Sequence, residues 1–89
     1  MEEITIKKVM EILTEWNPLG NRASDITDLN GYRTEAIDIL FMISLNKGSN
    51  VSGIIQQVLN QAFDISLTKE ECIRPAKKIF ELVGKDLEG

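Results

Sequence analysis

The chain has 89 residues, with ten basic and fourteen acidic side chains that give a net charge of −4. Hydrophobic residues make up 43% and charged residues 27% of it, as in an ordinary globular protein rather than a disordered or fibrous one. We therefore expect a single small domain spanning residues 1–89. Nucleic-acid binding is disfavoured, because it needs a concentrated positive surface and the basic residues here are scattered.

The first residues of the chain and its one cysteine indicate where in the cell the protein is expected. Met1-Glu2-Glu3 is acidic where a signal peptide would be basic, and no apolar run approaches the roughly 18 residues that a membrane helix needs. Cys72 is the sole cysteine, so no disulfide can form within the chain, as is typical of a reducing compartment. We therefore expect a cytoplasmic protein without a membrane segment.

The first predicted element is an amphipathic helix over about residues 3 to 16. Apolar residues from Ile6 to Trp16 recur there at steps of three and four, which is the helical period. Residues 17 to 31 are rich in proline, glycine, asparagine and aspartate, so they predict a loop. That loop is longer than most connections in compact domains.

Two further helices follow the loop. The second is predicted to begin at Tyr32 or Thr34, to be apolar over more than half of its circumference, and to end near Gly48. The third is predicted over residues 51 to 63, where apolar residues again keep the helical period, with Asn50 or the serine before it as the N-cap.

The fourth helix is predicted from a capping box. Thr68 and Glu71 have the spacing at which each satisfies a free donor at a helix start. Pro75 lacks a backbone donor, so we expect this helix to be kinked or split there, and we expect Gly84 to end it. The predicted fold is thus an all-α bundle of four main helices with a long loop after the first.

Catalytic chemistry is poorly represented. The chain contains no histidine, the commonest general base and a common metal ligand. Cys72 lies in helical phase with Ala76 and Ile79, so we interpret it as a small core residue rather than a nucleophile. One cysteine is also too few for a zinc site. We therefore predict a protein that is not an enzyme and that holds no cofactor or metal.

Two short patterns in the predicted loop match known sites poorly. A calcium-binding loop that started at Ile26 would have Ile37 as its twelfth residue, and both of these positions require carboxylates. The sequence Ser24-Asp25-Ile26 reverses the Asp-Ser-Leu order at which acyl carriers attach their prosthetic arm. Neither pattern supports a ligand.

Several stretches resemble a known family. They are Trp16-Asn17-Pro18-Leu19-Gly20 after the first helix, Tyr32-Arg33-Thr34-Glu35 at the start of the second, and Phe63 and Glu70-Glu71-Cys72 before the last. Together they resemble the YugE-like family of small helical proteins of unknown function from Bacillus and its relatives. An aspartate usually precedes the proline in that family, where this chain has Asn17. The resemblance implies a compact helical domain and no known activity, cofactor or partner.

The leading hypothesis is a non-catalytic domain that binds another protein, of unknown identity, through residues 17–35 and the adjacent face of the first helix. The long polar loop lies beside an aromatic anchor, and interface hot spots favour tryptophan, tyrosine and arginine. The candidate partner-binding residues are Trp16, Leu19, Arg22, Tyr32, Arg33 and Glu35.

Three alternatives stay open. One is an acidic immunity-type protein that neutralises a basic toxin by charge complementarity. Another is a small-molecule-binding domain, or an enzyme that uses carboxylates alone, with Glu35 and Asp38 in a pocket between helices; Glu35 equally suits the free backbone donors of a helix start. The third is a homodimer in which a second copy covers the apolar surface of the second helix.

Overall fold

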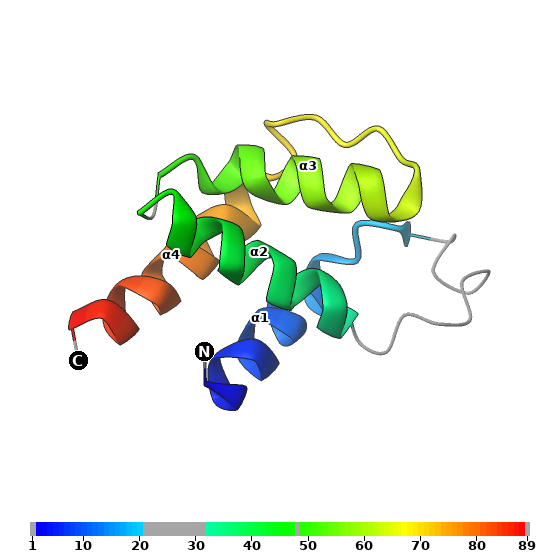
Figure 1. The fold of residues 1–89 in the computed structure, drawn as a ribbon. Coiled ribbons are helices and arrows are strands. Elements are labelled where there is room, and N and C mark those ends of the chain that lie inside the picture. Colours follow the sequence, from blue (N-terminus) through cyan, green and yellow to red (C-terminus); the bar gives the residue numbers. More distant parts are fainter. Residues whose placement is uncertain (1, 21–31, 48, 89) are drawn as a thin grey trace.

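The computed structural model describes residues 2–20, 32–47 and 49–88, which contain four helices and no strand (Figure 1). The helices are α1 (Glu3–Trp16), α2 (Arg33–Leu45), α3 (Val51–Phe63) and α4 (Ile73–Glu88). The predicted all-α fold of four helices is confirmed. Most of the predicted loop after α1 lies in residues 21–31, outside the described residues. Among those described, no helix is both long and apolar enough to cross a membrane.

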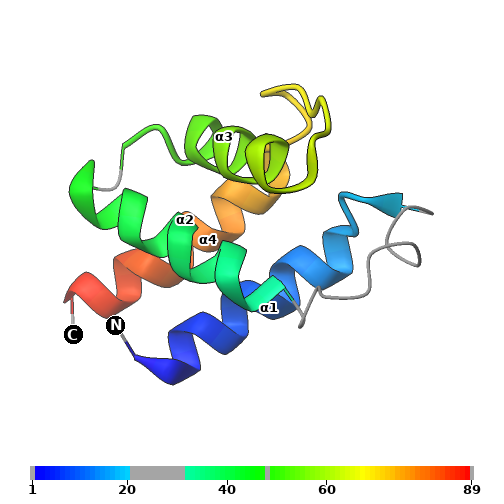
Figure 2. The ribbon, with the colours of Figure 1, turned by 45° about the vertical axis from the view of Figure 1, so that its right-hand side comes forward.

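The helices pack so that α2 and α4 lie on opposite sides of the core. Each of these two helices contacts both α1 and α3. In Figures 1 and 2, α4 passes behind α2 while α3 lies along one edge of both. The outer surfaces of α2 and α4 therefore face away from one another.

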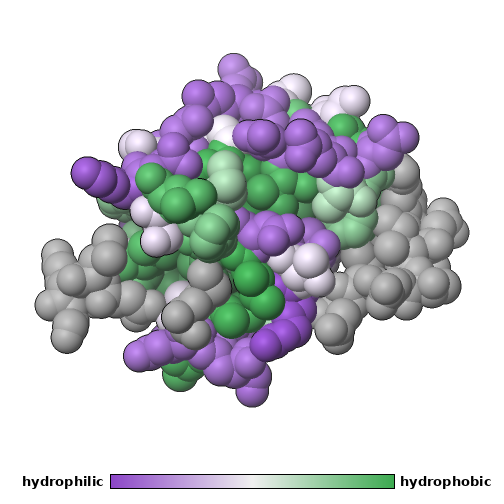
Figure 3. Space-filling model, in the orientation of Figure 1, coloured by the Kyte–Doolittle hydropathy of each residue, from purple (hydrophilic) through white to green (hydrophobic). Residues whose placement is uncertain are grey.

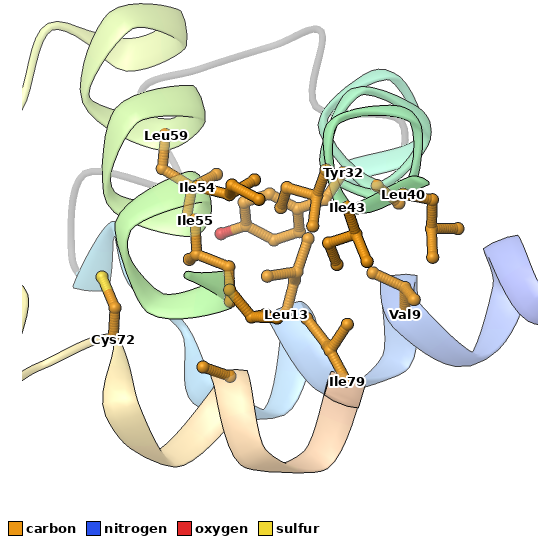
Figure 4. Packing of buried hydrophobic residues seen from close by; sticks show 14 of the residues in the cluster. Val9, Leu13, Tyr32, Leu40, Ile43, Ile54, Ile55, Leu59, Cys72 and Ile79 are labelled. Carbon is orange, nitrogen blue, oxygen red and sulfur yellow. The ribbon is translucent and has the colours of Figure 1, made fainter. Parts of the chain in front are cut away.

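The core is formed by one apolar stripe from each helix. Its largest fully buried aliphatic side chains are Val9 and Leu13 of α1, Ile39 and Ile43 of α2, Ile55 and Leu59 of α3, and Ile79 of α4. Figure 4 shows six of them converging between the helices, namely Val9, Leu13, Ile43, Ile55, Leu59 and Ile79. The helical periodicity of the sequence is the reason, since residues three and four apart share one face of a helix.

The fourth helix begins later than its capping box indicates. The Glu71 N–H donates to Thr68 Oγ1 at 3.2 Å, so the cap contact forms. The next backbone bonds nevertheless have the tighter 3₁₀ spacing, with Ile73 N donating to Glu70 O at 3.2 Å. Pro75 explains this start, because it has no N–H to donate to Glu71.

Pro75 accordingly lies in the first turn of α4, where a missing donor is tolerated. The kink or split predicted at Pro75 stays a prediction. The predicted end of the helix at Gly84 is wrong, because α4 continues to Glu88. A glycine inside a helix costs only about 1 kcal/mol relative to alanine, which is too little to end a helix by itself.

Candidate functional site

The site is organised by the turn that ends α1. Asn17 adopts the left-handed conformation with φ 53°, and its N–H donates to Leu13 O at 2.9 Å. Asparagine tolerates this conformation better than most residues, and it closes the last turn of the helix. The Gly20 N–H then donates to Asn17 O at 3.1 Å, while Leu19 is buried between them with 5% of its surface exposed. This turn fixes Trp16 as the last residue of α1.

Trp16 lines a groove between the end of α1 and the start of α4. The groove has a volume of about 270 Å³, and its lining residues are Ile12, Glu15 and Trp16 of α1 with Arg74, Pro75 and Lys78 of α4. Trp16 is half-buried and packs against the core. Trp16 therefore contacts the core and also contributes to the wall of this groove.

The groove carries more positive than negative charge. Arg74 and Lys78 are one helical turn apart on α4, and both are exposed. Glu15 is the one acidic lining residue, and within the described part of the chain none of these three side chains is in an ion pair. The groove therefore presents two cations beside an aromatic ring, which suits a carboxylate with an apolar neighbour.

Tyr32 lies near the C-terminal end of residues 17–35, the predicted interaction segment, and it is buried. Its exposed fraction is 4%, and its ring meets Phe63 of α3 edge to face with centroids 6.0 Å apart. Burial raises the pKa of its hydroxyl, and the nearby charge of Glu35 adds to the rise. Burial therefore removes both Tyr32 and Leu19 from the side chains that a partner can touch directly in this conformation.

Arg33 is already bound within the chain. Its guanidinium donates two hydrogen bonds to the carboxylate of Glu3, from Nη1 to Oε2 at 2.5 Å and from Nη2 to Oε1 at 2.7 Å. The paired guanidinium lowers the pKa of Glu3. This bidentate pair fastens the start of α2 to the start of α1, so a partner would have to compete with Glu3 for Arg33.

The remaining candidates lie apart. Arg22 is outside the described residues. Glu35 is half-buried in the first turn of α2, where negative charge favours the helix dipole, and its charge helps to raise the pKa of Tyr32. Asp38 instead lines a groove between α2 and α3 that also contains Phe41, and Glu35 is not among its described lining residues. The structure thus does not bring Glu35 and Asp38 together as a described carboxylate pair.

Other chemistry is sparse in the described part of the chain. No three side chains of the types Cys, Asp, Glu and His gather there as metal ligands. Cys72 is fully buried, as the sequence predicts, and burial together with the Glu71 charge raises the pKa of its thiol to about 11. A thiol of this kind is protonated at neutral pH and is a weak nucleophile.

Comparison with protein families gives one match. The model of a domain of unknown function, DUF1871, matches residues 8–86. The chain belongs to this family. The matched part of this DUF1871 domain contains every residue that lines the Trp16 groove. No curated protein and no solved structure matches the chain.

The α4 side of the groove in this DUF1871 domain is not predicted from the sequence. Trp16 is predicted as an anchor, but Arg74, Pro75 and Lys78 are not. The available signal is that Arg74 and Lys78 are four residues apart, on one face of a predicted helix. The sequence does not show that this face lies against the end of the first helix.

Proposed function

We propose that this DUF1871 domain is a non-catalytic interaction domain that binds an acidic segment of another protein at the Trp16 groove, next to the 17–35 segment. One observation carries the proposal. The only tryptophan of the chain lines a groove beside Arg74 and Lys78, which form no ion pair within the described residues. Tryptophan and arginine are the residue types most enriched among interface hot spots.

The chemistry of the groove indicates the chemistry of the partner. A carboxylate placed between Arg74 and Lys78 accepts charge-assisted hydrogen bonds, which are about twice as strong as neutral ones. An apolar or aromatic side chain next to that carboxylate packs on the indole of Trp16 and on Ile12. A segment in which Asp or Glu lies beside a large apolar residue satisfies both requirements.

The size of the groove favours a side chain over a free small molecule. Its volume is about 270 Å³, and pockets for small molecules usually measure about 300–1,000 Å³. Its charge also distinguishes between two kinds of protein partner, because an immunity-type protein needs an acidic surface to neutralise a basic toxin. Two cations against one carboxylate instead attract an acidic partner.

The finer parts of the proposal rest on the sequence. A non-catalytic role is supported by the absence of histidine from the chain and by the burial of its one cysteine. The narrower assignment to the YugE-like proteins of Bacillus stays a prediction, and so does the cytoplasmic location.

The experiment compares partners captured by matched variants of the whole chain. The variants Trp16→Ala and Lys78→Glu should lose a partner that the unaltered chain retains, because the first removes the anchor and the second reverses one cation. The purified partner should then quench or shift the fluorescence of Trp16 on binding. Loss of this anchor should weaken binding by about 2 kcal/mol or more, which is roughly a 30-fold rise in Kd.

The matched control is Lys8→Glu, which makes the same charge change at an exposed lysine of α1 that lies outside the groove. It should leave binding of this partner within about twofold of the unaltered chain. Arg22→Ala tests the segment next to the groove. If every captured partner bound Trp16→Ala and Lys78→Glu as tightly as the unaltered chain, the proposal would be wrong.

A further inference from the structure

Two exposed apolar surfaces lie on opposite sides of the molecule, and neither shares a residue with the Trp16 groove. The α2 face comprises Phe41 and Leu45, with 56% and 62% of their surfaces exposed, together with Asp38. Figure 3 shows hydrophobic surface gathered over α2 on the near side of the molecule. Large side chains exposed in this way mark an interaction surface.

The α4 face is the second surface. It comprises Ile73 and Phe80, with 44% and 54% of their surfaces exposed, and Lys77 between them. These three residues line a groove of about 370 Å³ between α4 and the start of α3. They recur at steps of four and three, so they form one stripe along α4.

The two faces match in spacing and are opposite in charge. Phe41 follows Asp38 by three residues on α2, and Phe80 follows Lys77 by three residues on α4. When the two helices lie parallel, Lys77 comes opposite Asp38 and Phe80 comes opposite Phe41 in the same register. The aspartate and the lysine can then pair while the two phenylalanine rings pack together.

The same register continues for one more helical turn. Leu45 lies four residues after Phe41, and Gly84 lies four residues after Phe80. Apart from its chain neighbours and the local helix backbone, no atom lies within 4 Å of the position where a Cβ of Gly84 would be, so the surface there is open to a bulky side chain. Glu81 is the one acidic residue that lines the α4 groove. In this register it comes opposite Met42, one residue after the pair of phenylalanines.

We infer that this chain associates with a second copy of itself head to tail, with the α4 face of one copy on the α2 face of the next. The two faces cannot meet within one molecule, since α2 and α4 lie on opposite sides of the core. An open assembly therefore leaves one α2 face free at one end and one α4 face free at the other. Such a heterologous contact produces a ring if it closes and a filament if it does not.

The test uses two variants that each lose one face, Phe41→Ser and Phe80→Ser. Both side chains are more than half exposed, so these changes leave the core intact. The mass of the unaltered chain, followed by light scattering over a concentration series, should rise beyond that of a dimer. Each variant alone should stay monomeric. An equal mixture should form a 1:1 dimer, because the intact α2 face of one variant meets the intact α4 face of the other.

Charge reversal provides an independent measurement. Asp38→Lys should weaken self-association by about tenfold, and adding Lys77→Asp in the same chain should restore it. Ile4→Ser is the matched control, because it removes an apolar side chain that is 58% exposed on α1 and should leave the mass unchanged.

Several outcomes would overturn the inference. One is an unaltered chain that stays monomeric up to millimolar concentration. Another is a Phe80→Ser variant that still dimerises, which would indicate a symmetric contact between two α2 faces. A third is a mixture of Phe41→Ser and Phe80→Ser that stays monomeric. Trp16→Ala should self-associate normally, so failure of the proposed partner site leaves this result unaffected.

Discussion

Tyr32 and Phe63 meet edge to face, with their ring centroids 6.0 Å apart and their planes at 87°. This contact joins the first residue described after the 21–31 segment to the end of α3. Tyr32 adopts a left-handed conformation with φ 65°, which is rare for a bulky residue and costs about 1–3 kcal/mol. Burial of the ring against Phe63 offsets that cost.

A double-mutant cycle should measure this contact. We expect Tyr32→Leu and Phe63→Leu to be coupled by about 0.5–1.5 kcal/mol in the free energy of unfolding, because each removes one ring of the pair. Urea unfolding followed by Trp16 fluorescence gives the value. Phe80→Leu on α4 is the control, and its effect should add to that of Tyr32→Leu without coupling. A coupling of zero between Tyr32 and Phe63 would contradict the contact.

The hydroxyl of Tyr32 should titrate at a higher pH in the folded protein than in the unfolded chain, because it is buried. Tyr32 is the only tyrosine of the chain, so tyrosinate absorbance reports this residue alone. Its pKa in the folded protein is raised above 10.0, the ordinary value that applies to the unfolded chain. The folded state therefore holds this proton more tightly, and the resulting stability is complete below pH 10 and is lost as the pH rises through the folded pKa.

The measurement compares the folded chain with the chain in urea, where the tyrosinate should form at lower pH. Tyr32→Phe should remove this part of the alkaline loss of stability. If the tyrosine titrated at the same pH in both states, its hydroxyl would not be buried as the structure describes.

Asn60 should stabilise the connection between α3 and α4. Its side chain accepts a hydrogen bond from Leu67 N at 2.8 Å and donates one to Leu67 O at 3.2 Å. We expect Asn60→Ala to lower the free energy of unfolding by about 1–3 kcal/mol, because it leaves a partly buried backbone N–H without a partner. Gln61→Ala, at an exposed position of the same helix, should change it by less than about 0.5 kcal/mol. Equal effects of the two substitutions would argue against this role of Asn60.

Cys72 should react slowly with thiol reagents. Its thiol is fully buried and has a pKa of about 11, so little thiolate is present at pH 8 and the reagent has no direct access. Reaction in the folded state should therefore require unfolding, and it should become fast in denaturant. The rate of modification, measured with and without urea, gives the comparison. Rapid modification of the folded protein would place Cys72 at the surface.

The helices of this protein are largely determined by its sequence. Apolar residues at steps of three and four set the bounds of α1, α2 and α3 to within about three residues, because this periodicity is a local property of the chain. The burial of Cys72 follows from the same phase. The start of α4 is predicted less accurately from its capping box. The contact between Thr68 and Glu71 forms, but Pro75 delays the α-helical bonds.

The candidate site was decided by the tertiary structure. Trp16 is an evident anchor in the sequence, yet only the packing of α1 against α4 brings Arg74 and Lys78 beside it. Packing likewise buries Tyr32 and pairs Arg33 with Glu3, 30 residues away. Periodicity indicates which face of a helix is buried, but the partner of that face depends on how helices distant in sequence share one core.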